Sequence, residues 1–215
     1  MMSNLDSNNS NVSSQDENQA VTHLPTAVSY PESLGLFPSD LISHEIAASL
    51  PSTYTIRPLR KSDYAMGFLN CLRVLTTVGD ISESEWNERY EWMSTQGKGG
   101  YYLLVIEDRG RIVGTGALII VKSKANKRIK YFSIHKLGLV GHVEDIAVAE
   151  DQQGKKLGLK IIQALDYIAQ RVGCYKCILD CSEANEGFYV KCGYKRAGLE
   201  MARYYNANVP SKKEP

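Results

Sequence analysis

The chain has 215 residues, of which 43% are hydrophobic and 23% charged, and its formal net charge at pH 7 is +1. This length and balance are typical of a soluble globular protein with one domain and a full core. The small net charge offers no bulk field for nucleic acid, no apolar run is long enough to span a membrane, and the polar N-terminus lacks a secretory pattern. We therefore expect a cytoplasmic protein that binds neither nucleic acid nor a membrane.

The two ends of the chain differ in composition from its middle. Residues 1–30 are rich in Ser, Asn and Gln and contain no Lys or Arg, so they cannot bury enough apolar surface to offset their ordering entropy, and we expect a disordered polar tail. Residues 31–53 are expected to form an N-terminal extension with a short helix capped by Ser39 or Asp40. A domain over 54–206 and a frayed C-terminus over 207–215 would follow.

A regular pattern begins at residue 54, where alternation predicts a strand over 54–59. Leu69, Leu72 and Leu75 recur at helical spacing and predict a helix. The sequence Ser82-Glu-Ser-Glu85 is a capping box that begins a second helix, with Trp86, Tyr90 and Met93 on one face and glycines at its end.

The middle of the chain predicts a β-meander. The stretches 101–107 and 111–121 flank the turn Asp108-Arg-Gly110 and read as a hairpin. Two more strands are expected over 129–135 and 142–148. The Lys and Arg residues that precede and begin the third strand, within 122–130, are typical of a solvated loop.

The last third of the chain begins with a strongly amphipathic helix. Its apolar stripe runs from Leu157 to Val172, and Gly173 suits its C-terminal cap. A strand over 175–181, a helix over 185–192 and a strand over 194–204 complete the chain. This element order predicts an α/β or α+β protein, a central sheet with helices on both faces.

Three of the five cysteines crowd into the stretch Cys174-Tyr-Lys-Cys177-Ile-Leu-Asp-Cys181. On a strand, Cys177 and Cys181 would share a face while Cys174 falls out of phase. No second Cys-x-x-Cys pair and no paired histidines complete a tetrahedral zinc site. We therefore expect thiols that pack in the protein and no metal site.

The loop Gln153-Gly-Lys-Lys-Leu-Gly158 before the amphipathic helix suits an anion. A helix N-terminus offers unpaired N–H groups and the positive end of the macrodipole, so it binds phosphate well. Gly154 and Gly158 let the backbone approach a ligand closely, and Lys155 and Lys156 add positive charge. The loop is neither a dinucleotide fingerprint nor a Walker loop, and its glycines could also serve only to turn the chain.

This loop resembles the pyrophosphate-binding loop of the GNAT superfamily of N-acetyltransferases, with Lys156 where that superfamily usually has glycine. The stretches 142–148, 173–181 and 185–194, together with 75–79, look like the glucosamine 6-phosphate N-acetyltransferases, of the fungal type with an extended N-terminus. The resemblance implies a mixed, mostly antiparallel twisted sheet that is splayed where acetyl-CoA binds. It also implies acetylation of glucosamine 6-phosphate for UDP-N-acetylglucosamine synthesis, by direct attack in a ternary complex.

The resemblance further implies which residues bind each substrate. Acetyl-CoA would be held by a strand end, the loop and one helix: Ile146, Ala147, Val148, Gln153, Gly154, Lys155, Lys156, Leu157, Gly158, Leu159, Tyr189 and Lys191. The amino sugar phosphate would be held by acidic, basic and pocket-lining residues: Thr76, Phe132, Ser133, His135, Glu144, Asp145, Tyr175, Lys176, Asp180 and Arg203. The basic residues for the phosphate would come partly from a neighbouring subunit, which makes a homodimer with a shared active site.

Catalysis needs a proton donor for the leaving thiolate and an acceptor for the amine proton. The phenol of Tyr189 has an ordinary pKa of about 10 and can donate to a thiolate, although it could also be a core tyrosine beside Phe188. Glu144, Asp145 and Asp180 are the candidate acceptors, and a water chain to Glu144 is an equal alternative. Asp180 lies between apolar neighbours, which predicts ligand binding or a buried ion pair.

Two other functions remain open from the residues. The same fold could acetylate another small amine, such as a polyamine or an aminoglycoside, or a protein N-terminus. The chain could instead be a CoA-binding module without turnover. Joint presence of the proposed donor and carboxylates favours an enzyme.

Overall fold

The computed structural model describes residues 35–120, 139–199 and 201, and the backbone of 122–125 and 128–131. The expected tail over 1–30 and the frayed end over 207–215 lie outside the described residues. Five strands form the main sheet in the order β1-β2-β3-β6-β7. Their bounds are β1 Tyr54–Pro58, β2 Tyr101–Asp108, β3 Arg111–Ile120, β6 Leu139–Val148 and β7 Cys174–Ile178.

The sheet is mixed and mostly antiparallel, as expected. β1, β2, β3 and β6 pair antiparallel to their neighbours, and only β7 runs parallel to β6. The hairpin between β2 and β3 turns at Arg109 and Gly110, whose φ values are 49° and 81°. Two successive residues with positive φ give the turn the twist that a two-residue hairpin needs.

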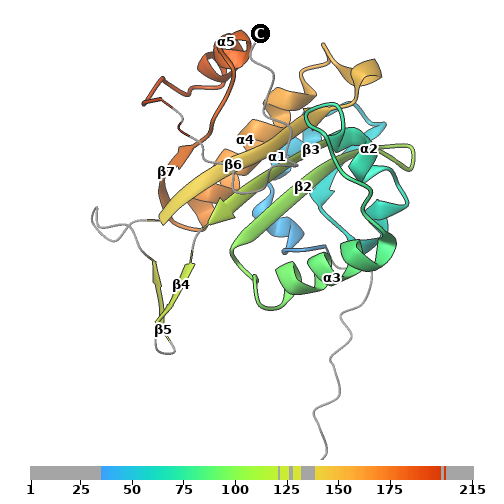
Figure 1. Ribbon diagram of the computed structural model, residues 1–215. Coiled ribbons are helices and arrows are strands. Elements are labelled where there is room, and N and C mark those ends of the chain that lie inside the picture. The colour runs from blue at the N-terminus through green and yellow to red at the C-terminus, as the bar shows by residue number, and fades with distance from the viewer. Residues whose placement is uncertain (1–34, 121, 126–127, 132–138, 200, 202–215) are drawn as a thin grey trace, which may run out of the picture. The chain divides into compact units, whose positions relative to one another are not determined.

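Helices cover both faces of this sheet, with α4 (Leu157–Arg171) lying across one face (Figure 1). A Cβ added at Gly116 of β3 would lie 2.5 Å from Cγ2 of Ile161 on α4, so the glycine permits this close approach. The stripe of α4 is almost wholly buried, and each such side chain contributes about 1.5–3 kcal/mol; its members include Leu157, Ile161, Leu165 and Ile168.

The opposite face carries α2 (Phe68–Leu72), whose Cys71 Sγ lies 3.9 Å from the carbonyl oxygen of Ala147 on β6. α3 (Glu83–Ser94) begins at the predicted capping box, and Trp86, Tyr90 and Met93 are buried as expected. The remaining helices are α1 (His44–Ala48) and α5 (Glu183–Lys191), with single turns at η1 Ser39–Leu41, η2 Lys61–Tyr64 and η3 Glu150–Gln152.

Several local predictions were wrong. The N-cap of α1 is Ser43, whose side chain accepts from the amide of Ile46, and not Ser39 or Asp40. α2 ends at Leu72, so Leu75 lies beyond it and is 50% exposed. α5 begins at Glu183, two positions before the predicted start.

The basic stretch after β3 is not the solvated loop that we expected. Its backbone forms two short strands, β4 (Lys122–Ala125) and β5 (Arg128–Tyr131), which pair antiparallel in a separate sheet. The described part of the predicted strand 129–135, which ends at Tyr131, therefore pairs with β4 and not with the main sheet. A run of charged residues does not by itself distinguish a loop from a short hairpin.

The C-terminal strand predicted over 194–204 does not form where the structure describes it. Residues 194–199 have no regular secondary structure, and Leu199 is 91% exposed. In the part of the chain that the structure describes, β7 remains the edge of the main sheet, because strand propensity alone does not decide whether a segment pairs.

The predicted orientation of the cysteines on this strand, with Cys177 and Cys181 on one face and Cys174 out of phase, was also wrong. The register of β7 against β6 shifts between Leu139, opposite Cys174, and Val140, opposite Lys176, so β7 carries one extra residue. As a result the sulfurs of both Cys174 and Cys177 lie within 3.5 Å of the position that a Cβ of Gly141 would take. Cys181 lies beyond the strand and is exposed.

Candidate active site

The site begins with a bulge in β6. Thr115 of β3 lies opposite Ala147, but Ala117 lies opposite Glu144, so β6 has two residues where β3 has one. One of them, Asp145, has a φ of 57°, a left-handed conformation that non-glycine residues seldom adopt. A bulge of this kind bends a strand and re-aims its backbone groups, which confirms the expected distortion.

The sheet is splayed next to this bulge. β6 pairs with β7 only between Leu139 and His142, while β6 itself continues to Val148. Past Ile178 the chain leaves the sheet and leads into α5, which lies near the diverging end of β6 (Figure 1). The C-terminal half of β6 therefore presents one edge that no described strand covers.

The loop after β6 offers a row of backbone donors. In the part of the chain that the structure describes, no backbone acceptor is recorded for the amides from Gly154 to Leu159. Gly154 and Lys156 have φ values of 78° and 61°, and Lys156 is the N-cap of α4. Successive amides in turns of mixed handedness form a concave anion site, reinforced here by the helix macrodipole. The left-handed φ of Lys156 also explains why glycine suits this position.

Side chains tie the loop to the sheet. The buried Gln152 accepts from Tyr54 Oη at 2.8 Å and from Lys155 Nζ at 2.7 Å, while Gln153 Nε2 donates to the carbonyl of Val148 at 3.3 Å. The ammonium of Lys155 is thus engaged within the loop. Backbone amides, more than this lysine, are the groups left to meet an anion.

The other predicted cofactor residues fall on both faces of β6 and on α4. Ile146 and Val148 contact the side of α4, where a Cβ at Gly116 would meet Ile146 and one at Gly158 would meet Val148. Ala147 is buried toward α2, and Leu157 is buried in the core. Leu159 is half-buried in the first turn of α4. The side chains of Ala147 and Leu157 are buried, so these two residues could touch a ligand only through their backbone.

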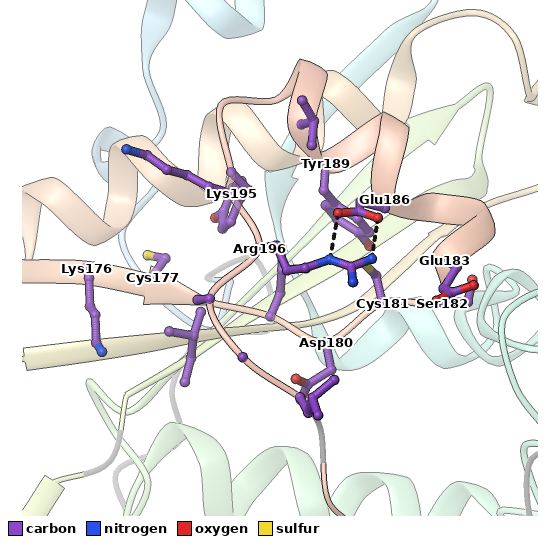
Figure 2. Close-up of a pocket in the computed structure, with 17 residues that line it drawn as sticks. Lys176, Cys177, Asp180, Cys181, Ser182, Glu183, Glu186, Tyr189, Lys195 and Arg196 are labelled. Carbon is purple, nitrogen blue, oxygen red and sulfur yellow. Dashed lines mark hydrogen bonds and ion pairs between the residues drawn. The ribbon is translucent and has the colours of Figure 1, made fainter.

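Tyr189 lies on α5, half-buried, with its ring 5.0 Å from Phe188 and 6.3 Å from Tyr194 between centroids. Figure 2 shows its side chain directed from α5 toward Cys181. Burial chiefly raises the pKa of the phenol, and the nearby Cys181, Cys192 and Glu144 raise it further. Tyr189 therefore stays protonated at neutral pH and can serve as an O–H donor.

A cavity of about 470 Å³ opens between the end of β7, α5 and residues 194–199. The structure brings three predicted residues to its wall: Lys176, Asp180 and Tyr189. Asp180 is exposed, so the expected buried ion pair is wrong and the ligand-binding reading remains. Lys176 extends its ammonium to 5.6 Å from the ring centroid of Tyr175.

Sequence reasoning missed several charged residues of this wall, namely Glu183, Glu186, Lys195 and Arg196. Nε and Nη2 of Arg196 donate to the two carboxylate oxygens of Glu186 at 3.0 and 2.7 Å, a bidentate ion pair between two residues of the cavity wall (Figure 2). The two residues are ten positions apart and separated by a helix end. No periodic signal in the sequence could have paired them.

Two predicted carboxylates lie at the bulge and not on the cavity wall. Glu144 is half-buried and contributes to the electrostatics of Tyr189. Asp145 is exposed at the surface, yet the surrounding protein removes part of its hydration, and this desolvation raises the pKa of its carboxyl group.

Other predicted residues lie elsewhere or cannot be placed. Thr76 is exposed in the turn after α2, Tyr175 is 48% exposed on β7, and Lys191 is exposed at the end of α5; none of them lines the 470 Å³ cavity. The predicted residues Phe132, Ser133, His135 and Arg203 lie outside the described residues.

Among the residues that the structure describes, no three His, Cys, Asp or Glu side chains are grouped so that they could hold a metal ion. Within the same residues, no helix has the length and apolar character needed to cross a bilayer.

Comparison with known proteins relates this chain to one family of acetyltransferases. Residues 65–194 match the model of the acetyltransferase (GNAT) family. The chain is 44% identical over 152 residues to the glucosamine 6-phosphate N-acetyltransferase of Candida albicans, covering 71% of this chain and 96% of that protein. It is 38% identical to glucosamine 6-phosphate N-acetyltransferase 1 of Dictyostelium discoideum, covering 70% of this chain and 90% of that protein.

Solved structures agree with these sequence relatives. The crystal structure of glucosamine-6-phosphate N-acetyltransferase from Arabidopsis thaliana superimposes with a TM-score of 0.65 at 34% identity, covering 72% of this chain and all of that one. The matched part of this chain therefore has the same overall fold as that structure.

Proposed function

Because the chain belongs to the acetyltransferase (GNAT) family, we propose that it transfers the acetyl group of acetyl-CoA to the amine of glucosamine 6-phosphate, giving N-acetylglucosamine 6-phosphate and CoA. The observation that carries this substrate is the 44% identity to a glucosamine 6-phosphate N-acetyltransferase whose length the chain spans almost completely. Relatives with other acceptors would not be expected to align over the whole acceptor-binding part at this identity.

The splayed sheet and the loop suit acetyl-CoA. The free amides from Gly154 to Leu159 would hold the pyrophosphate, and the uncovered edge of β6 past the bulge would donate hydrogen bonds to the pantetheine and the thioester carbonyl. An N–H aimed at that carbonyl stabilises the negative charge that grows on its oxygen. Such a donor contributes about 3–4 kcal/mol to catalysis in well-studied acyl-transfer sites.

The reaction needs no covalent enzyme intermediate. The amine nitrogen of the sugar forms the new bond to the acetyl carbon, the carbon–sulfur bond breaks, and the thiolate receives the proton of the Tyr189 phenol. The amine gives its own proton to a carboxylate near the bulge. Glu144, Asp145 and Asp180 form the acidic set from which this acceptor would come, either directly or through a water chain to Glu144.

We further propose that Lys176 and Arg203 hold the sugar phosphate and that the enzyme is a homodimer with a shared site. Leu199 and Met201 are 91% and 94% exposed, and such apolar side chains beside an edge strand suit a partner surface. Light scattering coupled to gel filtration tests the dimer. We also propose that the protein acts in the cytoplasm, where its product would feed UDP-N-acetylglucosamine synthesis.

The assignment is tested by CoA release from acetyl-CoA with glucosamine 6-phosphate, run beside glucosamine and spermidine. We expect release only with the phosphorylated sugar, because the phosphate is the group that the predicted cations bind. Blanks without acetyl-CoA are needed, since the five cysteines react with thiol reagents. Release with spermidine alone would retain the family and refute the substrate, and binding of acetyl-CoA without release would indicate a non-catalytic module.

A further inference from the structure

The end of α5 binds Tyr194 directly to Tyr189. The amide of Tyr194 donates to the carbonyl of Tyr189 at 3.0 Å, and the amide of Gly193 donates to the carbonyl of Val190 at 3.0 Å. Gly193 has a φ of 96°. These features form a Schellman motif, in which the residue after the left-handed glycine packs on the helix residue that accepts its amide. The rings of Tyr194 and Tyr189 make this contact at an interplanar angle of 72°.

Tyr194 is in turn anchored to α4. Its hydroxyl donates to Oδ1 of Asp166 at 2.7 Å, a charge-assisted hydrogen bond of the stronger kind. Asp166 is half-buried, and its neighbours Leu165 and Ile168 on α4 are fully buried in the core. The bond therefore connects the end of α5 to the most firmly packed helix of the domain.

α5 has few other means of fixing its rotation. The structure describes all nine residues of this helix, and none of them is buried. The N-cap residue, Ser182, makes no side-chain capping bond. Phe188 packs against Gly158 of α4, where a Cβ would lie 3.3 Å from its Cζ. Tyr189 itself also packs against the core, and Glu186 pairs with Arg196 in the segment after the helix. Of these ties, the bond from Tyr194 to Asp166 is the hydrogen bond that joins the C-terminal end of α5 to α4.

We propose that Tyr194, held by Asp166, is a positioning residue that fixes the direction of the Tyr189 phenol for proton donation, which rests on the proposed acetyl transfer. Tyr194 acts through Tyr189 by its amide and its ring, and its own hydroxyl faces α4, not the acceptor. Tyr194 lies on the wall of the 470 Å³ cavity beside Tyr189, and no proton or bond of the proposed transfer passes through its hydroxyl, which is engaged by Asp166.

The test removes only the anchoring oxygen. Tyr194→Phe keeps the ring and the backbone motif, and we expect kcat to fall about tenfold while the KM for acetyl-CoA changes by less than about twofold, because misplaced catalytic groups lower kcat and the pyrophosphate loop is untouched. Asp166→Asn retains an acceptor oxygen and should keep most of the wild-type kcat. Tyr167→Phe removes a hydroxyl from the adjacent position of α4 and should leave kcat unchanged.

A double-mutant cycle separates positioning from general damage. In a Tyr189→Phe background, Tyr194→Phe should lower kcat no further, since the group being positioned is gone. Equal losses in both backgrounds would overturn the proposal, and so would an undiminished kcat in the single variant.

A second measurement keeps the proposal testable if the substrate is wrong. The Tyr189 ring resonance, identified in ¹³C-tyrosine-labelled protein by its loss in Tyr189→Phe, should shift or broaden in Tyr194→Phe. Because phenylalanine retains the aromatic ring, only a changed geometry moves this signal. A wild-type protein without release from glucosamine 6-phosphate would refute the proposed function alone, whereas an unchanged Tyr189 resonance would refute the positioning role.

Discussion

Gly158 lies directly against Phe188. A Cβ at Gly158 would be 3.3 Å from Cζ and 3.7 Å from Cε2 of that ring. The glycine belongs to the first turn of α4, next to the loop that we propose binds the pyrophosphate, and Phe188 adjoins Tyr189, the proposed proton donor, on α5. The first turn of α4 and the helix α5 therefore come into contact at Gly158, where the absence of a side chain leaves room for the Phe188 ring.

Gly158→Ala tests this meeting point. The new methyl must displace the Phe188 ring by a few tenths of an ångström, so we expect the KM for acetyl-CoA to rise and kcat to fall, each by about three- to tenfold. Stability should change by less than about 1 kcal/mol, because alanine is the better helix former. Steady-state kinetics and urea unfolding measure the two effects.

The matched control is Gly187→Ala on α5, where a Cβ would have nothing within 4 Å. It should leave both kinetic constants unchanged. If Gly187→Ala lost as much activity as Gly158→Ala, the site would be sensitive to any added methyl group. The contact of Gly158 with Phe188 would then not explain the loss in Gly158→Ala.

Tyr189→Phe tests the proton donor. We expect kcat to fall about a hundredfold, in the range of general acid catalysis, with little change in either KM. Because burial and nearby groups raise the pKa of this phenol above its ordinary value, the wild-type rate should not decline through loss of this proton until the pH exceeds about 10. A variant with wild-type kcat would remove Tyr189 from the chemistry.

Lys156→Gly tests the loop conformation. Lys156 has a φ of 61°, which costs a residue with a Cβ roughly 1 kcal/mol. Glycine should therefore raise the free energy of unfolding by up to about 1 kcal/mol, measured by urea denaturation. Lys155→Gly, at a neighbouring position without positive φ, should lower it, and stabilisation by both glycines would point to charge rather than backbone strain.

Arg57 supports the sheet from inside. Its guanidinium donates to the two oxygens of the fully buried Asp63 at 2.9 and 2.7 Å and to Glu107 at 2.9 Å. Arg57→Leu leaves Asp63 buried without its cation, and we expect a loss of about 3–5 kcal/mol of unfolding free energy. Arg111→Leu breaks an exposed ion pair with Asp151 and should cost less than about 1 kcal/mol; equal costs would contradict the role of burial.

The sequence predicted elements whose signals are local. The capping box at Ser82 and the stripe of α4 report contacts within one helix, and each formed where expected. The loop from Gln153 to Gly158 and the Phe188–Tyr189 pair were recognisable because anion binding and proton donation need particular residue types at fixed spacing. These stretches carry the resemblance from which the acetyltransferase (GNAT) family was predicted, and the match of residues 65–194 to the model of that family confirms it.

Tertiary structure decided what depends on partners far away in the chain. The extra residue in β7 put Cys174 in phase with Cys177, and residues 194–199 do not form the strand that their sequence predicts. The left-handed φ of Asp145 arises from pairing with β3. The bond from Tyr194 to Asp166 spans 28 positions. Composition and periodicity describe a residue's own segment, whereas register, handedness and anchoring are set by whichever segment folds against it.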